Sequence, residues 1–521
     1  MPLSVPGVTN WSFFAPAQAR VGESVQFALA ATNTSSPDAR APGYGTDRTA
    51  QREKTSREDW SPPTASLSVS TGKCPRAAPP QVTPIATGAP DAEPATMELR
   101  TALERRKRNP LSPYPPEAWA AELLRHGLQH KYPSLVRGLT EGFDLGIPWI
   151  SHTYTPPNHL SISSLSNVYK SIVDNEFAAG RYLGPFTCKQ LEALIGPFQT
   201  SPLSLVPKAS KPGKYRAVHD FSHPHVPSPH ATSINSHVDS DNFPCTWGTF
   251  STVALLMSRL PPGSQASVRD VAEAYRTIPV TPSQWPGLVI RLQSSDQFAV
   301  NTCNNFGLAS AGGVYGMVAD AGADVFRSCG IGPLAKWVDD HIFFRIPRTQ
   351  IPNYNMRRSN WQREIQAGGG RRQSGSRLWY GGKDLPDGST EEFDEDCSVP
   401  LKDLANASPC SEKDLDFAYA DADIDEISSR LGIQWEPSKS IPFGSEVPYL
   451  GFRWDLRARV VFLLDEKRAK YLAAIDEWEK KRMHNLLETQ RLYGKLLHAT
   501  MVIPAGRAYL TNLEAHAGLV Q

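Results

Sequence analysis

The sequence predicts an α+β fold, because strand-like and helix-like segments alternate without a regular repeat. Short apolar runs typical of central strands occupy 266–268, 288–292, 334–338 and 342–344. Segments with helical composition or apolar spacing occupy 165–179, 188–194, 247–260 and 310–327. Turn residues such as Pro261-Pro-Gly263 separate the two kinds of segment. We therefore expect strands and helices to share one mixed architecture.

Composition limits the number of domains, the compartment and the partners that we expect of this protein. The chain has 521 residues, enough for two or three domains, and its net charge of +1 neither demands nor excludes a nucleic-acid partner. Its seven cysteines are scattered and form no Cys-x-x-Cys, which favours free thiols in a reducing compartment. We find no apolar run long enough to cross a membrane and no secretory leader, so we expect an intracellular protein, cytoplasmic or nuclear, without a membrane partner.

Composition also divides the chain into segments. Residues 1–96 are expected to be a mostly disordered tail, because 32–96 are rich in Ser, Thr, Pro, Ala and Gly; 21–29 could form one strand. Helices are expected at 98–107, 466–483 and 486–499, with a pair of helices within 115–138. Strands are expected at 431–435 and 449–452, and on both sides of a turn at 211–213 within 202–221. The six expected units are 1–96, 97–200, 201–345, 346–425, 426–465 and 466–521, of which 346–425 is an insertion, partly disordered.

Three aspartates are the main candidates for chemistry. Asp339 and Asp340 lie between two apolar runs, and Asp270 ends a third run. Like charges at strand ends repel one another unless a cation lies between them, and carboxylate oxygens suit Mg²⁺. The set fits a two-metal site for phosphoryl or nucleotidyl transfer, with Mn²⁺ as a substitute. Alternatively, the adjacent pair is only a polar hairpin turn.

Companion residues follow in a suitable order. Tyr275 could stack under the sugar of a nucleotide and exclude a 2′-hydroxyl, or it could be a core tyrosine. Gly313 opens a small-residue helix that could approach a nucleotide closely, or that merely packs tightly. Lys208 and Arg216, with Lys211 and Lys214, could hold a triphosphate, or the hairpin could be a solvated basic one.

Two further groups leave alternatives open. Lys439 follows the aspartate pair and could protonate pyrophosphate as a general acid, although most single lysines are simply exposed. Five histidines lie within 219–237, but without a cysteine or a helix that carries a paired His-x-x-x-His they do not predict a metal site. The basic tetrad at 105–108 is either a nuclear-localisation patch or a solvated helix end.

Taken in order, these blocks resemble the reverse transcriptase of retroelements, over roughly residues 110–521. The blocks are Tyr215-Arg216-Ala-Val-His-Asp220, Asp270-Val-Ala-Glu-Ala-Tyr275, Phe306-Gly-Leu-Ala-Ser310, Trp337-Val-Asp-Asp340 and Tyr449-Leu-Gly-Phe452. Two flanking blocks, Pro157-Asn-His159 and Gly494-Lys-Leu-Leu-His498, resemble the DIRS-like, tyrosine-recombinase retrotransposons most. Trp337 departs from the tyrosine that is usual two residues before the pair.

The resemblance implies a right-hand polymerase with fingers (within 97–345), palm (201–345 and 426–465) and thumb (466–521). It implies that Asp270, Asp339 and Asp340 hold two Mg²⁺, and that Lys208, Arg216, Tyr275 and Gly313 bind dNTP. It also implies a primer grip at Tyr449, Leu450 and Gly451, and an RNA or DNA template with a primer. We see no RNase H carboxylate set before Gln521.

We therefore expect an RNA-directed DNA polymerase, a nucleotidyltransferase, from a retrotransposon-derived gene. The first alternative is a catalytically inactive or domesticated remnant that binds nucleic acid. The second is an RNA-dependent RNA polymerase, against which Tyr275 argues.

Overall fold

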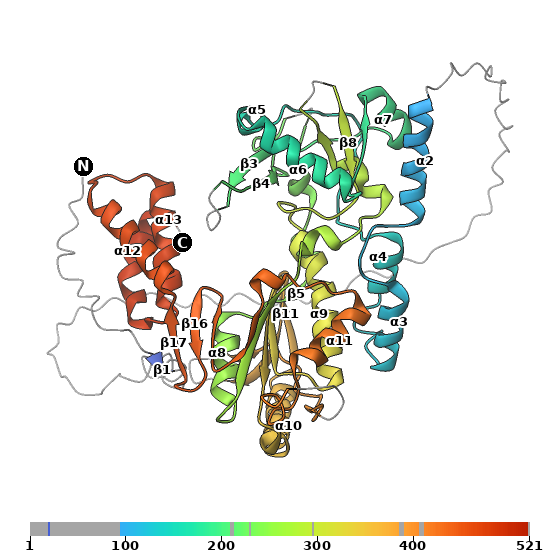
Figure 1. Cartoon of the computed structure of the whole chain (residues 1–521). Helices are drawn as coiled ribbons and strands as arrows, with labels where there is room; N and C mark the ends of the chain where they lie inside the picture. Colours follow the sequence, from blue (N-terminus) through green and yellow to red (C-terminus); the bar gives the residue numbers. More distant parts are fainter. Residues whose placement is uncertain are drawn as a thin grey trace, which may run out of the picture.

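A computed structural model describes residues 19–20, 94–208, 213–228, 231–293, 296–384, 390–405 and 411–518. The expected disorder of 1–96 and the strand at 21–29 therefore fall almost wholly outside the described residues. The mixed helix-and-strand class is confirmed. Three lobes form a U in Figure 1: an N-terminal lobe, a central lobe and a C-terminal helical lobe, with the ends of the U turned toward each other.

The central lobe is built on an antiparallel sheet with the strand order β14-β6-β10-β9. The strands are β6 (Gln265–Asp270), β9 (Leu334–Trp337), β10 (Asp340–Arg345) and β14 (Ile441–Gly444). The register places Asp340 opposite both Asp270 and Trp337. Strands β6 and β10 are buried over nearly their whole length, as expected of strands covered on both faces.

Helices cover this sheet. Helix α9 (Ala311–Cys329) is buried along most of its length and packs on β10 through Phe326, whose ring meets Phe343 edge-on at 5.3 Å. Helix α8 (Phe250–Arg259) is likewise apolar, and its Phe250 packs on Trp454 at 5.1 Å. Each helix has the small or aliphatic residues that allow a close approach to strands.

The segment 346–425 belongs to the central lobe wherever it is described. It contains α10 (Ile351–Ala367), β11 (Arg371–Ser374), β12 (Arg377–Asp384), β13 (Thr390–Phe393) and the start of α11 (Asp421–Leu431). Strand β12 pairs in parallel with β5 (Cys245–Thr246), so the segment continues the lobe's own hydrogen bonding. A fully buried ion pair between Arg358 and Glu395 fixes α10 to the strands. The expected disorder in this segment is not tested, because 385–389 and 406–410 lie outside the described residues.

The N-terminal lobe combines helices with two small sheets. Its helices are α2 (Pro94–Arg108), α3 (Pro116–Arg125), α4 (Leu135–Glu141), α5 (Leu160–Ser164), α6 (Ser166–Ala178) and α7 (Cys188–Ile195). Its strands are β2 (Tyr182–Phe186), β3 (Leu203–Pro207), β4 (Tyr215–His219), β7 (Val289–Arg291) and β8 (Phe298–Asn301). Helices α3 and α4 lie beside α9 in Figure 1 and join this lobe to the central one.

The C-terminal lobe stands on a hairpin sheet. Strands β15 (Glu446–Tyr449), β16 (Phe452–Asp455) and β17 (Val460–Leu463) pair in sequence, and β1 (Ala19–Arg20) adds to β17. Helices α12 (Asp465–Glu479), α13 (Leu486–Thr500) and α14 (Thr511–His516) follow. None of the described helices is long and apolar enough to cross a bilayer.

Two expected strands are wrong. Leu431 is the last residue of α11 rather than the start of a strand, and Gly432 ends the helix with a φ of +70°. Of 431–435 only Trp435 makes an isolated bridge, to Val271. The second, 449–452, is centred on a turn, because β15 ends at Tyr449 and β16 begins at Phe452. The expected helices at 98–107, 165–179, 188–194, 247–260, 310–327, 466–483 and 486–499 are confirmed with small shifts at their ends.

Candidate metal and nucleotide site

Three carboxylates converge at one end of the central sheet. Asp270 is the last residue of β6 and is buried, whereas Asp339 and Asp340 are half-buried at the β9–β10 hairpin. One oxygen of each carboxylate lies within 4.8 Å of the others. The antiparallel register brings them together, because it pairs Asp340 directly with Asp270.

The hairpin turn explains how two adjacent aspartates can reach the same point. Side chains that follow each other in a strand point to opposite faces. Asp339, however, lies in the turn with Val338, which adopts a φ of +56°. A β-branched residue rarely adopts a left-handed conformation, and such strain costs about 1–3 kcal/mol. The backbone N–H of Val271 holds the turn by donating to the Asp339 carbonyl at 3.0 Å.

The charges of the cluster are compensated from within the chain. Burial raises the pKa of the Asp340 carboxyl to about 7, and its hydrogen bond with Asp270 and the charge of Asp339 add to this effect. Burial also raises the pKa of Asp339. Lys439 lies 2.8 Å from both oxygens of Asp270 through its Nζ. A proton on one carboxyl and an ammonium on another therefore offset the repulsion.

The donor set fits divalent cations. It is made of carboxylate oxygens alone, the type that Mg²⁺ and Mn²⁺ prefer. A divalent cation would replace the proton that burial favours on Asp340, because it stabilises the charged form of that carboxyl. The three residues that would hold the metal are Asp270, Asp339 and Asp340.

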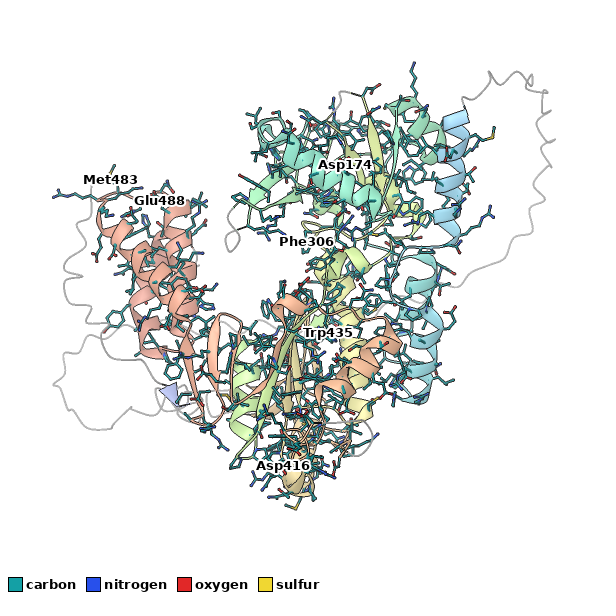
Figure 2. The ribbon with its side chains drawn as sticks, viewed as in Figure 1. Asp174, Phe306, Asp416, Trp435, Met483 and Glu488 are labelled. Atoms are coloured by element: carbon teal, nitrogen blue, oxygen red, sulfur yellow. The ribbon has the colours of Figure 1, made fainter. Side chains whose placement is uncertain are left out.

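Tyr275 lies beside the carboxylates in an aromatic cluster. Its ring meets Phe306 edge-on at 4.5 Å and Tyr315 at 5.7 Å. Burial and the charge of Asp339 raise the pKa of the Tyr275 hydroxyl to about 12, so it stays protonated at neutral pH. Figure 2 places Phe306 on the inner side of the U, where the N-terminal and central lobes meet. The half-buried ring of Tyr275 thus forms part of the site's wall.

Gly313 has a packing role that can be stated from geometry. A Cβ on Gly313 would overlap the carbonyl oxygen of Phe243, whereas a Cβ on Gly312 would make only ordinary contacts, such as 3.5 Å to the Tyr275 hydroxyl. The glycine at 313 is therefore needed for the close approach of α9 to the loop that precedes β5. Its role in nucleotide binding stays a prediction.

The predicted triphosphate cations lie elsewhere. Lys208 follows β3 and Arg216 lies within β4, both exposed, on the N-terminal lobe hairpin of Figure 1. The N–H of Lys208 donates to the Lys214 carbonyl at 2.8 Å, which closes the described part of the hairpin. Lys211 lies outside the described residues. No ion pair within the described residues joins either cation to the carboxylates, so their role stays a prediction.

The turn predicted as a primer grip contacts the site directly. The hydroxyl of Tyr449 donates to the Asp340 carbonyl at 3.0 Å. Leu450 and Gly451 both have positive φ, +53° and +81°, as a two-residue hairpin turn requires. His498 of α13 lies over this turn: its Nε2 is 3.1 Å from the Leu450 carbonyl and its ring stacks on Phe452 at 4.3 Å.

These contacts were not foreseen from the sequence. His498 was noted only as part of a family-like block, and nothing in its helix predicts that it reaches a turn almost fifty residues earlier. The pairing of Trp337 with Trp247, edge-on at 5.0 Å, was also missed. Trp247 directly follows β5, and the only available signal was its aromatic character.

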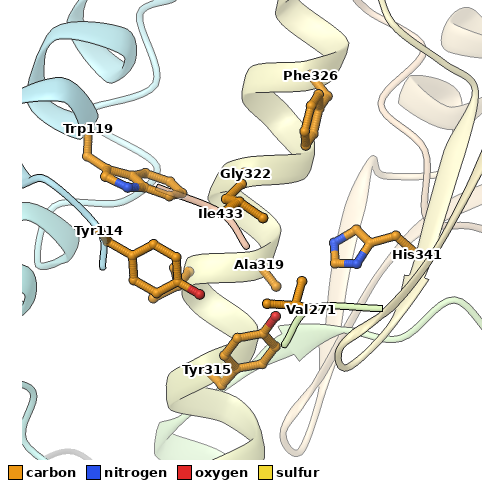
Figure 3. A pocket seen from close by; sticks show the side chains of 10 residues that line it. Tyr114, Trp119, Val271, Tyr315, Ala319, Gly322, Phe326, His341 and Ile433 are labelled. Atoms are coloured by element: carbon orange, nitrogen blue, oxygen red, sulfur yellow. The ribbon is translucent and has the colours of Figure 1, made fainter. Parts of the chain in front are cut away.

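A small cavity lies behind the site (Figure 3). Tyr114 and Trp119 line one side, α9 runs along it, and Val271 and His341 close the side toward the sheet. Its volume of about 10 Å³ is close to the minimum for a single water molecule. The cavity is therefore a packing defect rather than a nucleotide pocket.

No protein-family model matches the chain, and no curated protein matches it by sequence. Among solved structures, it is similar to the foamy viral protease-reverse transcriptase in complex with an RNA/DNA hybrid, at 14% identity and a TM-score of 0.40, over 84% of this chain and 44% of that one. It is also similar to the foamy viral protease-reverse transcriptase dRH in complex with double-stranded DNA, at 13% identity and a TM-score of 0.38. That match covers 84% of this chain and 58% of the other one. A third match, in complex with dsDNA, has 14% identity and a TM-score of 0.36, over 77% and 62%. The chain thus spans about half the length of these chains, and likeness at this level identifies no function.

Proposed function

We propose that this protein is the polymerase part of a retroelement reverse transcriptase, an RNA-directed DNA polymerase of the DIRS-like kind. The convergence of Asp270, Asp339 and Asp340 at one strand end supports the proposal most. The strained turn at Val338 adds support, because unfavourable backbone conformations persist mainly at functional sites.

The carboxylates would hold two Mg²⁺, with rigid strands fixing their positions. Bound Mg²⁺ lowers the pKa of the attacking 3′-hydroxyl and neutralises the triphosphate and the departing pyrophosphate. Lys439, which binds Asp270 in this structure, would give its proton to the departing pyrophosphate.

The remaining predicted residues would bind and position the substrates. Tyr275 would exclude the 2′-hydroxyl, and the backbone at Gly313 would lie beside the dNTP. Lys208 and Arg216 would bind triphosphate oxygens, for which exposed cations on a hairpin are suited.

Tyr449, Leu450 and Gly451 would hold the primer strand, because the Tyr449 hydroxyl joins their turn to the backbone of Asp340. Template and primer would be bound mainly through phosphates, and binding would therefore weaken as salt rises.

Primer extension tests the proposal. The wild-type chain, given an RNA template, a DNA primer, dNTPs and Mg²⁺, should extend the primer, and Asp339→Ala should abolish extension. Asp174→Ala is a matched control, because Asp174 is exposed on the N-terminal lobe and pairs only with the neighbouring Lys170. Equal extension by wild type and Asp339→Ala would refute the proposal, and a preference for ribonucleotides would favour an RNA polymerase.

One observation favours a second candidate, a non-catalytic remnant that binds nucleic acid. Lys439 occupies both oxygens of Asp270, so the cluster is partly neutralised without a metal. A remnant of this kind would bind primer–template but gain no thermal stability from Mg²⁺ or Mn²⁺, whereas a functional site gains stability with metal concentration.

A further inference from the structure

A second cluster of metal-ligand side chains lies in the N-terminal lobe, away from the carboxylates. Asp220 directly follows β4, and His223 and His225 follow in the next turn. One ligand atom from each of the three lies within 4.8 Å of the others. The N–H of His223 donates to the Asp220 carbonyl at 3.0 Å, so a backbone turn brings the three side chains together.

The distance between His225 and Asp220 is the one expected for two ligands of a tetrahedral ion. Nε2 of His225 and Nε2 of His159 lie 3.2 and 3.4 Å from the same oxygen, Oδ2 of Asp220. Charge-assisted N–H···O bonds are shorter, about 2.8 Å. Ligands on a tetrahedral zinc, at bonds of about 2.0–2.1 Å, lie about 3.3 Å from one another.

Charge and surroundings favour a cation here as well. Within the described residues, the ion-pair partners of Asp220 are both histidines, so no lysine or arginine takes the place of an ion. The Tyr154 hydroxyl lies 3.5 Å from Nε2 of His223, an outer contact of the kind that orients a histidine ligand. The cluster is half-exposed, which leaves a path for the ion from solvent.

A comparable cluster of Glu122, His126 and Cys329 is less suited to a cation. Although its ligand atoms also lie within 4.8 Å of one another, Arg125 takes one oxygen of Glu122 at 3.1 Å and Arg430 approaches the same oxygen at 3.9 Å. Two guanidinium groups beside a single carboxylate disfavour a further cation.

We propose that Asp220, His223 and His225 form a binding site for a zinc-like transition-metal ion, with the fourth position open to water. Two imidazoles and a carboxylate are a donor set that Zn²⁺ accepts and that differs from the all-carboxylate magnesium site. The ion would fix the turn after β4, which carries all three ligands. This site does not depend on the polymerase proposal.

The test is direct binding of Zn²⁺, and of Co²⁺ as a spectroscopic substitute, to the full chain stripped of metal by a chelator. All measurements use an Asp270→Asn, Asp340→Asn background, which removes the carboxylate site. We expect one Zn²⁺ per chain, an affinity at least tenfold weaker in His223→Ala and in His225→Ala, and no change in His516→Ala, an exposed histidine on α14.

The spectrum of bound Co²⁺ tests the ligands in the chain whose histidines are intact, so it does not depend on the folding of the histidine variants. Bound Co²⁺ should give the strong visible bands of a tetrahedral ion without a thiolate-to-cobalt band in the near ultraviolet. A thiolate band would place the ion at Cys329 or another cysteine and overturn the proposal. Unchanged Zn²⁺ affinity in the His223→Ala, His225→Ala double variant would overturn it equally.

Discussion

Removing the ionisable group from Asp340 should make the metal-free protein more stable at alkaline pH. Burial beside two other carboxylates raises the pKa of Asp340 to about 7, from 3.8. The folded state therefore keeps a proton that the unfolded chain has already lost. The free energy of unfolding falls as pH rises from about 4 to about 7, and it stays low above that pH.

The magnitude follows from the shift. At 1.36 kcal/mol per pH unit, ionising Asp340 in the folded state costs at most about 4 kcal/mol at pH 8. Asp340→Asn keeps a neutral side chain that can hydrogen-bond Asp270, and so avoids this cost. The free energy of unfolding of Asp340→Asn, relative to that of wild type, should rise by about 2–3 kcal/mol between pH 5 and pH 8.

The assay is urea unfolding of wild type and Asp340→Asn in a chelator, at several pH values from 5 to 8. Asp174→Asn is the control, because it makes the same substitution at an exposed position on the N-terminal lobe. Mg²⁺ at 100 times the Kd should narrow the gap, because wild type gains about 2.7 kcal/mol and the variant, which has lost a ligand, gains less. A stability gap that does not change with pH, or a less stable variant at pH 8, would refute the reasoning.

Three other predictions concern neighbouring residues. Gly313→Ala should lower the free energy of unfolding by about 1–3 kcal/mol, because the added Cβ overlaps Phe243, while Gly312→Ala should change it little. Equal midpoints of urea unfolding for the two variants would contradict this packing. Tyr275→Ala should raise ribonucleotide incorporation relative to deoxynucleotide incorporation in a primer-extension assay, and an unchanged ratio would argue against a sugar gate. Lys439→Met should lower the Mg²⁺ concentration needed for half-maximal thermal stabilisation, because it removes the ammonium from Asp270. A higher Mg²⁺ concentration at the half-maximum would show instead that Lys439 assists Mg²⁺ binding.

The aspartates could be found from the sequence because their signal is local. Each lies at the end of an apolar run, and the order of the runs predicts antiparallel neighbours. The approach of Lys439 to Asp270 could be expected only from the resemblance, since the two are 169 positions apart. The contact of His498 with Leu450 was not expected at all, because a stacked histidine leaves no periodic pattern in its helix.

The helix and strands of the segment 346–425 could not be predicted from its sequence, because its packing is partly ionic. Helix α10 is rich in arginine, asparagine and glutamine, so it lacks the apolar stripe by which a core helix is recognised. Its anchor is Arg358, which is almost completely buried against Glu395. Helix α11 was missed for a different reason: Ile424, Ile427 and Leu431 do have helical spacing, but they lie among acidic residues.

Several unfavourable features of the molecule are gathered in one hairpin, and this concentration bears on function. Val338 is strained, Asp340 favours its protonated form, and Asp339 lies beside two like charges. The β9–β10 pairing itself needs none of these features, because a glycine in the turn and neutral side chains would leave its register intact. A proton on Asp340 and the ammonium of Lys439 offset part of the repulsion, and a bound cation would offset the rest, so these features support the proposed metal site.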